Sequence, residues 1–261
     1  MRAIWTGAIG FGLVNIPVKL YSATQGSELD LDMLDKKDHS RIHFKRVNAH
    51  TGREVAWENI VRGYMYNNKY IVLTDQDFEK ASPEKSKTIR IDQFVKESEI
   101  DSIYFESPYY LAPEKSGVRP YALLRDALKK TGKAGLGTYV LRNKEVLGLI
   151  IVRDDVLILN KIRFQQEIRS TKELNLPDIK AKAGELKMAT ALIDQLTAPF
   201  DISEYKDSYS EQLLKFIKAR SKGKGKEKEK PVMRVVHSRT NDLMSQLKES
   251  LSAKSHKRKA S

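Results

Sequence analysis

The 261-residue sequence contains no cysteine. This absence excludes disulfide scaffolds, zinc ribbons, iron–sulfur clusters and thiol nucleophiles, because each of them needs a cysteine side chain. The sequence also lacks any run of 18 or more apolar residues, the length that a membrane-spanning helix requires. Glycines and Asn15 interrupt the apolar N-terminal stretch before any signal-peptide cleavage pattern occurs. We therefore expect a soluble, intracellular protein in a reducing compartment.

Positive charge is abundant but unevenly distributed. The chain has 47 Lys and Arg residues against 34 Asp and Glu, a net charge of +13. Residues 1–217 hold 33 basic and 30 acidic side chains, whereas residues 218–261 hold 14 and 4. The body is therefore nearly balanced, and the tail supplies most of the excess. Such an excess favours a polyanionic partner.

The tail has too few apolar residues to form a core over its first part. Lys218–Lys230 reads KARSKGKGKEKEK, which predicts a disordered, self-repelling linker. A mobile arm of this kind can bind a phosphate backbone without reading sequence, although basic tails also serve solubility alone. The candidate DNA-binding residues of the tail are Lys222, Lys224, Lys226, Lys228, Lys257, Arg258 and Lys259.

The body is rich in short β-strand patterns. We predict one long strand or a bent pair over residues 1–21, and two strands around Asn143-Lys144, with Asp154-Asp155 turning into a further strand. Other short strands are expected at 65–66, 70–73, 88–94, 103–111 and 156–159. So many short strands separated by turn residues indicate a β-barrel or sandwich, not a doubly wound fold.

One further hairpin carries basic side chains. Residues 41–47 alternate between apolar and basic positions, a turn follows at Asn48–Gly52, and Val55 and Trp57 continue the apolar face. A basic strand face is typical of backbone binding but also of plain solvated surface. The candidate DNA-binding residues of the body are Arg41, Lys45, Arg46, Arg53 and Arg62.

Helical patterns dominate the C-terminal part. Apolar stripes predict helices over 119–130, 185–196 and 207–219, with Gly132 ending the first. A last amphipathic helix beyond the linker carries Leu243, Met244, Leu247 and Leu251 on one face. Because it has no core of its own, we expect it to dock on a partner more readily than on this chain.

No catalytic motif stands out. The histidines His39, His43 and His50 lie among cations that would repel a metal ion, so we predict no metal site and no cofactor. The glycines of residues 131–140 lack the Walker order. Asp154, Asp155 and Glu114 are the acidic residues that a metal-dependent nuclease would use, but a turn explains the two aspartates equally well. No helix-turn-helix or RNA-recognition pattern is visible either.

Four blocks cover most of residues 1–217: MRAIWTGAIGFGLVNIPVKLYSAT at the N-terminus, GREVAWENIVRGYMYNNKYIVLTDQDF (52–78), YYLAPEKSGVRPYALLRDAL (109–128) and ELKMATALIDQLTAPFDISEYKDSYSEQLLKFI (185–217). In this order they resemble the prokaryotic Ku family of DNA-end-binding proteins in bacterial non-homologous end joining. The segment DLMSQLKESL (242–251) resembles the family's C-terminal element.

The resemblance implies a mixed β/α fold, with a Ku-type β-barrel core over residues 1–180 and a protruding two-strand arm at about 36–63. A helical segment over 181–220 would brace the partner subunit. The disordered Lys-rich tail, 221–261, would carry a partner-binding helix at about 241–252.

The function implied is a non-enzymatic homodimeric ring around double-stranded DNA ends. It would recruit the ATP-dependent end-joining ligase (DNA ligase D type) and lie in the cytoplasm with the nucleoid. A metal-dependent nuclease acting on ends and a histone-like DNA compaction protein are the alternatives.

Overall fold

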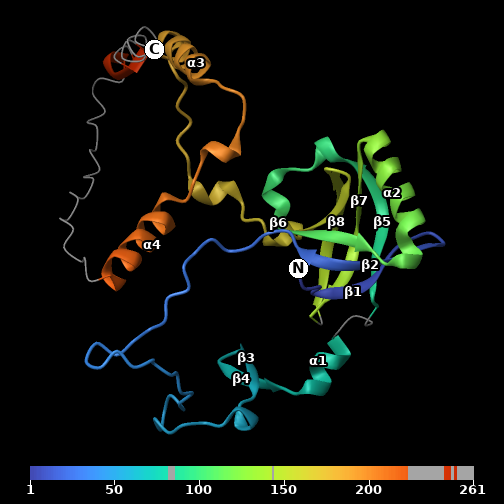
Figure 1. The fold of residues 1–261 in the computed structure, drawn as a ribbon, viewed down its shortest axis with the longest axis vertical. Coiled ribbons are helices and arrows are strands. Elements are labelled where there is room, and N and C mark those ends of the chain that lie inside the picture. The colour runs from blue at the N-terminus through green and yellow to red at the C-terminus, as the bar shows by residue number, and fades with distance from the viewer. Residues whose placement is uncertain (82–85, 143, 223–243, 248–249, 252–261) are drawn as a thin grey trace. The chain divides into compact units, whose positions relative to one another are not determined.

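The computed structural model describes residues 1–81, 86–142, 144–222, 244–247 and 250–251 (Figure 1). The chain divides into two compact units. The first comprises Met1–Gly26 and Leu31–Ser170, and the second comprises Ser27–Asp30 and Thr171–Ser261. The first unit contains the strands and the second is helical, so the predicted mixed β/α class is confirmed.

The first unit is built on a closed barrel in the order β1-β2-β6-β9-β8-β7-β5. Neighbouring strands are antiparallel except β1 and β5, which pair in parallel and close the barrel. The strands are β1 (Trp5–Phe11), β2 (Val14–Ser22), β5 (Thr88–Lys96), β6 (Phe105–Pro113), β7 (Lys133–Leu141), β8 (Lys144–Arg153) and β9 (Val156–Ile162). A separate two-stranded sheet pairs β3 (Arg62–Tyr66) with β4 (Lys69–Leu73).

The tight turns between strands explain the hairpins. Asp154 and Asp155 both adopt positive φ (46° and 64°), as do Asn67 and Asn68 (46° and 61°). Asp and Asn tolerate this left-handed conformation better than other non-glycine residues, and paired positive φ values match the twist of a hairpin. The turn predicted at Asp154-Asp155 is therefore confirmed, and its cause is the positive φ that both aspartates adopt between β8 and β9.

Apolar side chains fill the barrel from alternate positions. Ile16, Val18 and Leu20 of β2 are fully buried, whereas the residues between them are only half-buried. On β8 the buried positions run together from Gly148 to Ile151, because the outer face is also covered. Leu149 and Ile151 pack there with Ala134 and Ile162 in a second apolar cluster.

Helix α2 (Val118–Thr131) contributes a stripe of side chains to the core. Tyr121, Leu124 and Leu128 are buried in the same cluster as the barrel interior, as the stripe predicts. The helix ends at Gly132, whose φ of +62° and N–H bond to the Leu128 carbonyl form the expected left-handed cap. Figure 1 shows α2 running alongside the barrel.

The Tyr121 hydroxyl joins this helix to two strands. It donates to the Leu111 carbonyl of β6 (2.7 Å) and accepts from the Leu157 amide of β9 (2.8 Å). Leu111 and Leu157 form the last pair of the β6–β9 ladder, so the hydroxyl links the strands where their direct pairing stops. Burial raises the pKa of this phenol, which keeps it in the protonated form that can donate.

The remaining helices are mostly short. The α-helices are α1 (Asp75–Ala81), α3 (Ala183–Leu196) and α4 (Ser208–Ser221). The 3-10 turns are η1 (Trp57–Asn59), η2 (Glu97–Glu99), η3 (Ser102–Tyr104), η4 (Lys115–Gly117), η5 (Gln165–Glu167), η6 (Thr171–Leu174) and η7 (Ile202–Glu204). Asp207 caps α4 through its carboxylate, which accepts from the Ser210 amide at 3.1 Å.

Several predicted boundaries need correction. Of the two alternatives stated for residues 1–21, the pair of strands is confirmed, since β1 and β2 form an antiparallel hairpin. The strand expected from Ile103 begins at Phe105, because Ser102–Tyr104 is a 3-10 turn capped by Asp101. The linker expected from Lys218 is helical as far as Ser221, since α4 continues through it. The rest of the predicted linker, from residue 223, lies outside the described residues.

The barrel offers a matched test of buried hydroxyls. Tyr121→Phe removes a donor to Leu111 and leaves the Leu157 amide unpaired, so we expect a loss of about 1–3 kcal/mol in unfolding free energy. Tyr139→Phe removes a buried hydroxyl for which the described residues offer no hydrogen-bond partner, so we expect stability to be unchanged or increased. Urea unfolding followed by circular dichroism measures both; equal losses in the two variants would contradict this account.

Candidate nucleic-acid interface

The basic candidates of the body lie in residues 31–81, which we call the arm segment. It contains η1, β3, β4 and α1, and two isolated antiparallel bridges, Leu34↔Arg41 and Val47↔Glu54. A turn over Asn48–Arg53 closes the second bridge, with the Gly52 amide donating to the Asn48 carbonyl at 2.8 Å. The predicted turn at Asn48–Gly52 is thus confirmed.

The strands predicted on either side of that turn are wrong in extent. Within residues 41–47 only Arg41 and Val47 form bridges, to Leu34 and Glu54, and there is no regular ladder. Trp57 begins the 3-10 turn η1. The regular two-strand sheet, β3–β4, lies between residues 62 and 73, next to the range of 36–63 that we predicted for the arm. Alternation alone overestimated the strand because no packed face of this segment fixes a longer register.

Three of the five basic candidates are bound to carboxylates. Arg41 pairs with Asp32 (2.5 Å), Lys45 with Glu54 (2.7 Å) and Arg62 with Asp75 (3.3 Å). All three pairs are well exposed to solvent. Exposed pairs contribute only about 0–1 kcal/mol, so an incoming phosphate can replace these carboxylates at little cost.

Arg46 and Arg53 differ from those three residues. The Val55 amide donates to the Arg46 carbonyl (2.9 Å) and the Asn48 amide to the Arg53 carbonyl (2.8 Å). In this antiparallel pairing Arg46 and Arg53 share one face of the turn, and Lys45 and Glu54 share the other. Within the described part of the chain, neither arginine is paired with a carboxylate.

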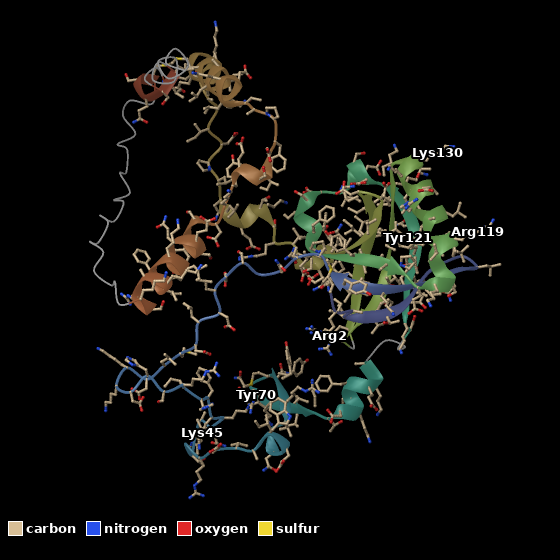
Figure 2. All side chains as sticks on the ribbon, viewed as in Figure 1. Arg2, Lys45, Tyr70, Arg119, Tyr121 and Lys130 are labelled. Atoms are coloured by element: carbon tan, nitrogen blue, oxygen red, sulfur yellow. The ribbon has the colours of Figure 1, made fainter. Side chains whose placement is uncertain are left out.

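The Arg46 guanidinium also stacks on an aromatic ring. Its Cζ lies 4.6 Å from the ring centroid of Trp57, which is 71% exposed. Stacking of this kind orients a guanidinium without neutralising its charge, because the ring carries no net charge. The face with Arg46 and Arg53 therefore presents two exposed cations, of which Arg46 is oriented by the ring. Figure 2 labels Lys45 and Tyr70 of the arm segment.

Sequence reasoning missed the apolar side chains of the arm. On β3 and β4, Tyr64, Tyr66, Tyr70 and Val72 are each more than half exposed. The two strands pair through a turn at Asn67-Asn68, but no residue of the sheet is buried. The aromatic and β-branched composition of residues 64–72 was the available signal, since such side chains normally cover a face.

The tail candidates are described only in part. Lys222 is exposed at the C-cap of α4. Lys224, Lys226, Lys228, Leu243, Lys257, Arg258 and Lys259 lie outside the described residues. Met244, Leu247 and Leu251 are helical and half-buried, and a Cβ built on Gly184 of α3 would lie 3.7 Å from Met244 Cε. In this structure Met244 therefore lies near α3 of the same chain. From the sequence we expected this helix to dock on a partner more readily than on its own chain.

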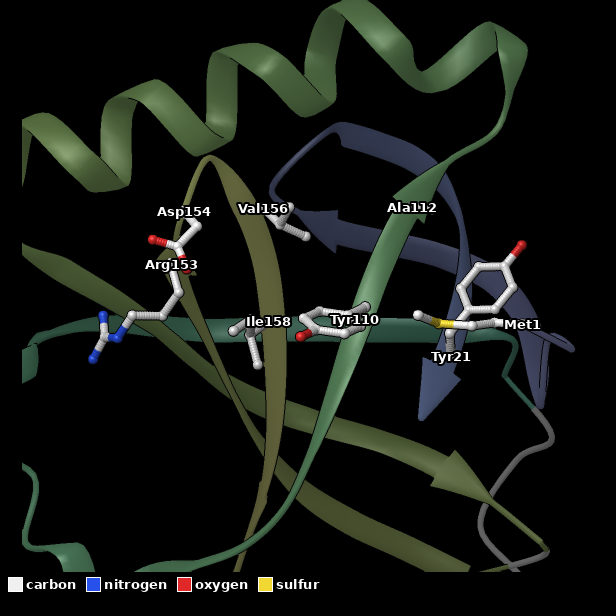
Figure 3. Close-up of a pocket in the computed structure, with 8 residues that line it drawn as sticks. All are labelled: Met1, Tyr21, Tyr110, Ala112, Arg153, Asp154, Val156 and Ile158. Carbon is white, nitrogen blue, oxygen red and sulfur yellow. The ribbon is translucent and has the colours of Figure 1, made fainter. Parts of the chain in front are cut away.

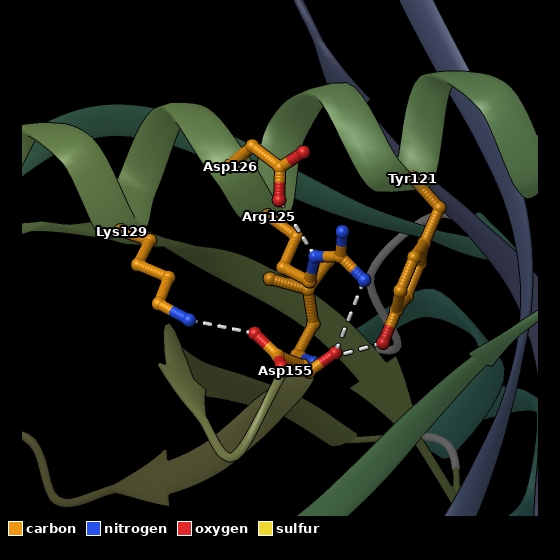
Figure 4. Close-up of polar contacts among 6 residues, drawn as sticks. Tyr121, Arg125, Asp126, Lys129 and Asp155 are labelled. Atoms are coloured by element: carbon orange, nitrogen blue, oxygen red, sulfur yellow. Dashed lines mark hydrogen bonds and ion pairs between the residues drawn. The ribbon is translucent and has the colours of Figure 1, made fainter.

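The acidic candidates for a nuclease do not form a common site. Asp154 and Asp155 occupy the β8–β9 turn, and Asp155 accepts a hydrogen bond from Lys129 of α2 (2.7 Å; Figure 4). That ammonium lowers the pKa of the Asp155 carboxyl. Glu114 pairs instead with Lys19 at 3.7 Å. The two aspartates therefore act as turn and anchor residues.

A hollow of about 570 Å³ on the barrel contains one of these acids. It is lined by Met1, Tyr21, Tyr110, Ala112, Arg153, Asp154, Val156 and Ile158 (Figure 3). Asp154 is the single carboxylate among these mostly apolar lining residues. The other charged residue of the hollow, Arg153, forms an ion pair with Glu97.

Over the described ranges, no three His, Asp or Glu residues are grouped so as to hold a metal ion. No helix in those ranges has the length and apolar character to cross a membrane.

Comparison with known proteins yields one family. Residues 10–188 match the model described as Ku70/Ku80 beta-barrel domain. The chain is 37% identical to the Non-homologous end joining protein Ku of Coxiella burnetii, over 99% of this chain and 97% of that protein. It is 42% identical to the protein of that name from Opitutus terrae (87% and 82% of the two chains) and 38% identical to that from Bacillus subtilis (83% and 71%).

Proposed function

The chain belongs to the Ku family, and from this premise we propose that it acts in non-homologous end joining as a homodimeric ring on double-stranded DNA ends. The observation that carries the proposal is the arm segment, where Arg46 and Arg53 project from one face without carboxylate partners in the described chain. The relatives named above share the family and cover most of the sequence.

The contacts proposed for the ring are to phosphates. A ring that accepts any end has to bind the backbone, since phosphate contacts fix position and carry no sequence information. Arg46 and Arg53 would bind first, and Arg41, Lys45 and Arg62 would exchange exposed carboxylates for phosphates. The tail cations, Lys222 among them, would add non-specific attraction.

Uncovered surface in both units supports the dimer. An isolated two-stranded sheet is only marginally stable in water, yet β3–β4 leaves Tyr64, Tyr66 and Tyr70 exposed. In the second unit α3 and α4 contain no buried residue, and Ile193, Phe200, Tyr205 and Tyr209 are each more than 60% exposed. Large apolar side chains left exposed in such number are typical of an interface, so we assign the arm and the helices to the contact between subunits.

Ligase recruitment is assigned to the C-terminal helix. Leu247 and Leu251 are four residues apart, so one face of the helix carries both. A helix of this kind binds a hydrophobic groove through its apolar face. In this proposal the chain itself catalyses no reaction, and the end-joining ligase supplies the chemistry.

The topology of the DNA tests the ring. This protein should bind linear duplex but not a covalently closed circle of the same sequence, because circular DNA has no free end that could enter the protein ring. A gel-shift series with both substrates, with the circle linearised as the control, measures the difference. Equal binding to both forms would contradict the ring and favour a compaction protein, and Mg²⁺-dependent cleavage that is lost in Asp154→Ala would favour a nuclease.

Reversing the two unpaired arginines tests the interface. Arg46→Glu with Arg53→Glu should weaken binding to linear duplex and reduce the salt dependence, since each phosphate contact contributes about −0.9 to the slope of log K against log salt. Fluorescence anisotropy over a salt series measures both quantities.

The control for this variant is Lys115→Glu with Lys144→Glu, which makes the same change in net charge at exposed positions outside the arm segment and outside α3 and α4. Affinity and slope should then stay close to those of the parent protein. Similar losses in the two double variants would show that net charge, and not the arm, governs binding.

The C-terminal helix is tested on its apolar face. Leu247→Asp with Leu251→Asp should abolish stimulation of end joining by the ligase while DNA binding persists, because the carboxylates prevent burial of this face. Gln246→Glu with Ser250→Asp adds the same charge at exposed positions of the helix and should leave stimulation intact. An end-joining assay, in which the ligase joins linear duplexes in the presence of each variant, reports the result. Full stimulation by the leucine variant would rule out this docking role.

A further inference from the structure

An apolar groove runs between α2 and the edge of the barrel. It has a volume of about 420 Å³, within the range of ligand-binding clefts of roughly 300–1,000 Å³. Its walls are almost entirely hydrophobic. One wall is Pro120, Leu123, Leu124, Ala127, Leu128 and Thr131 of α2, and the other is Phe11, Val14, Phe94 and Lys133 from the barrel strands.

The groove is rigid and uncovered. Tyr121 fixes α2 to β6 and β9, and the rings of Phe11 and Phe94 meet edge to face at 6.0 Å between centroids. Leu123 nevertheless remains 71% exposed and Phe94 41% exposed. A leucine in the middle of a helix and an aromatic ring on a sheet thus leave apolar surface in water beside a preformed cleft.

Positive charge surrounds this apolar surface. Lys133 lines the groove, and Arg119 and Lys130 are exposed near the two ends of α2 (Figure 2). None of these three cations forms an ion pair with a described carboxylate. The acids nearest to them in the sequence are bound by other cations: Asp126 by the Arg125 guanidinium at 2.8 Å and Glu114 by Lys19 at 3.7 Å.

We propose that this groove binds an acidic amphipathic helix of a partner protein. The hydrophobic walls would accept apolar side chains spaced at i, i+4 and i+7, and carboxylates flanking them would meet Arg119, Lys130 and Lys133. The chain's own tail is excluded as the occupant by charge, since residues 218–261 hold 14 basic and 4 acidic side chains. DNA would be attracted by the cations but has no apolar side chains to fill the groove between Leu123 and Phe94.

A pair of synthetic peptides tests the proposal on the full-length protein. The first is a fluorescent 16-residue helix with leucines at i, i+4, i+7 and i+11 and glutamates at the flanking positions. The second has lysine in place of every glutamate. Anisotropy at physiological salt should show binding of the glutamate peptide and at least tenfold weaker binding of the lysine peptide.

Variants locate the binding and separate the two interactions. Leu123→Gln should weaken the glutamate peptide about tenfold, whereas Ile103→Gln, at an exposed apolar residue of η3, should leave it unchanged. Lys133→Glu should weaken the glutamate peptide and strengthen the lysine peptide. Because none of these residues belongs to the proposed DNA contacts, binding to linear duplex should be the same in all three variants.

Four results would overturn the assignment. The first two are the absence of peptide binding up to about 1 mM, which corresponds to about −4 kcal/mol, and equal binding of the two peptides. The third is loss of the dimer in Leu123→Gln, measured by sedimentation, which would assign the groove to a second copy. The fourth is displacement of the peptide by duplex DNA together with weaker DNA binding in Lys133→Glu, which would assign the groove to DNA.

Discussion

The hydroxyl of Tyr121 is the contact on which the described barrel unit depends. It relays a hydrogen bond from the Leu157 amide to the Leu111 carbonyl, at the place where the ladder between β6 and β9 ends. Without it, a buried amide would lack a partner and α2 would lose its only buried polar contact with those strands in the described chain. The Lys129–Asp155 pair and the bond from Arg125 to the Asp155 carbonyl (3.5 Å) hold the same helix at the β8–β9 turn, but both are exposed and weaker (Figure 4). Because these contacts hold the helix against the barrel, they also set the shape of the groove between α2 and the barrel edge.

The barrel was largely predictable from the sequence, and the arm was not. Turn residues with a known preference for positive φ mark its hairpins, as at Asp154 and Asp155, and a buried stripe identifies α2. In the barrel each strand has a packed face, which fixes its register and makes alternation informative. In the arm segment Phe44 is 80% exposed and Trp57 71% exposed, so alternation there reports no burial. The predicted strand of residues 41–47 therefore reduces to two isolated bridges, one at each of its ends.

Residue type alone did not distinguish the candidate contacts. Composition identified all five basic residues of the arm equally, but three of them are engaged by acids that lie 9 to 13 positions away in the sequence. The distinction made for Arg46 and Arg53 comes from backbone pairing across the turn and from a ring, Trp57, that the pattern had assigned to a strand. The C-terminal helix shows the same limit. Its leucine spacing predicts an apolar face, but whether that face meets α3 or a partner depends on contacts that spacing does not determine.

The uneven charge of the chain gives the body and the tail different roles in the proposed complex. Because the body carries a net charge of only +3, its attraction for DNA at long range is weak, and salt screens exposed charges beyond about 8–10 Å. In the proposed complex the tail, at +10, would supply that attraction, which depends on charge and not on the shape of a DNA end. Recognition of ends would then require a closed path around the duplex, to which one copy contributes a two-stranded sheet that buries no residue of its own. A second arm that closes the path would cover the exposed tyrosines of β3–β4, so ring closure and folding of the arm would be coupled.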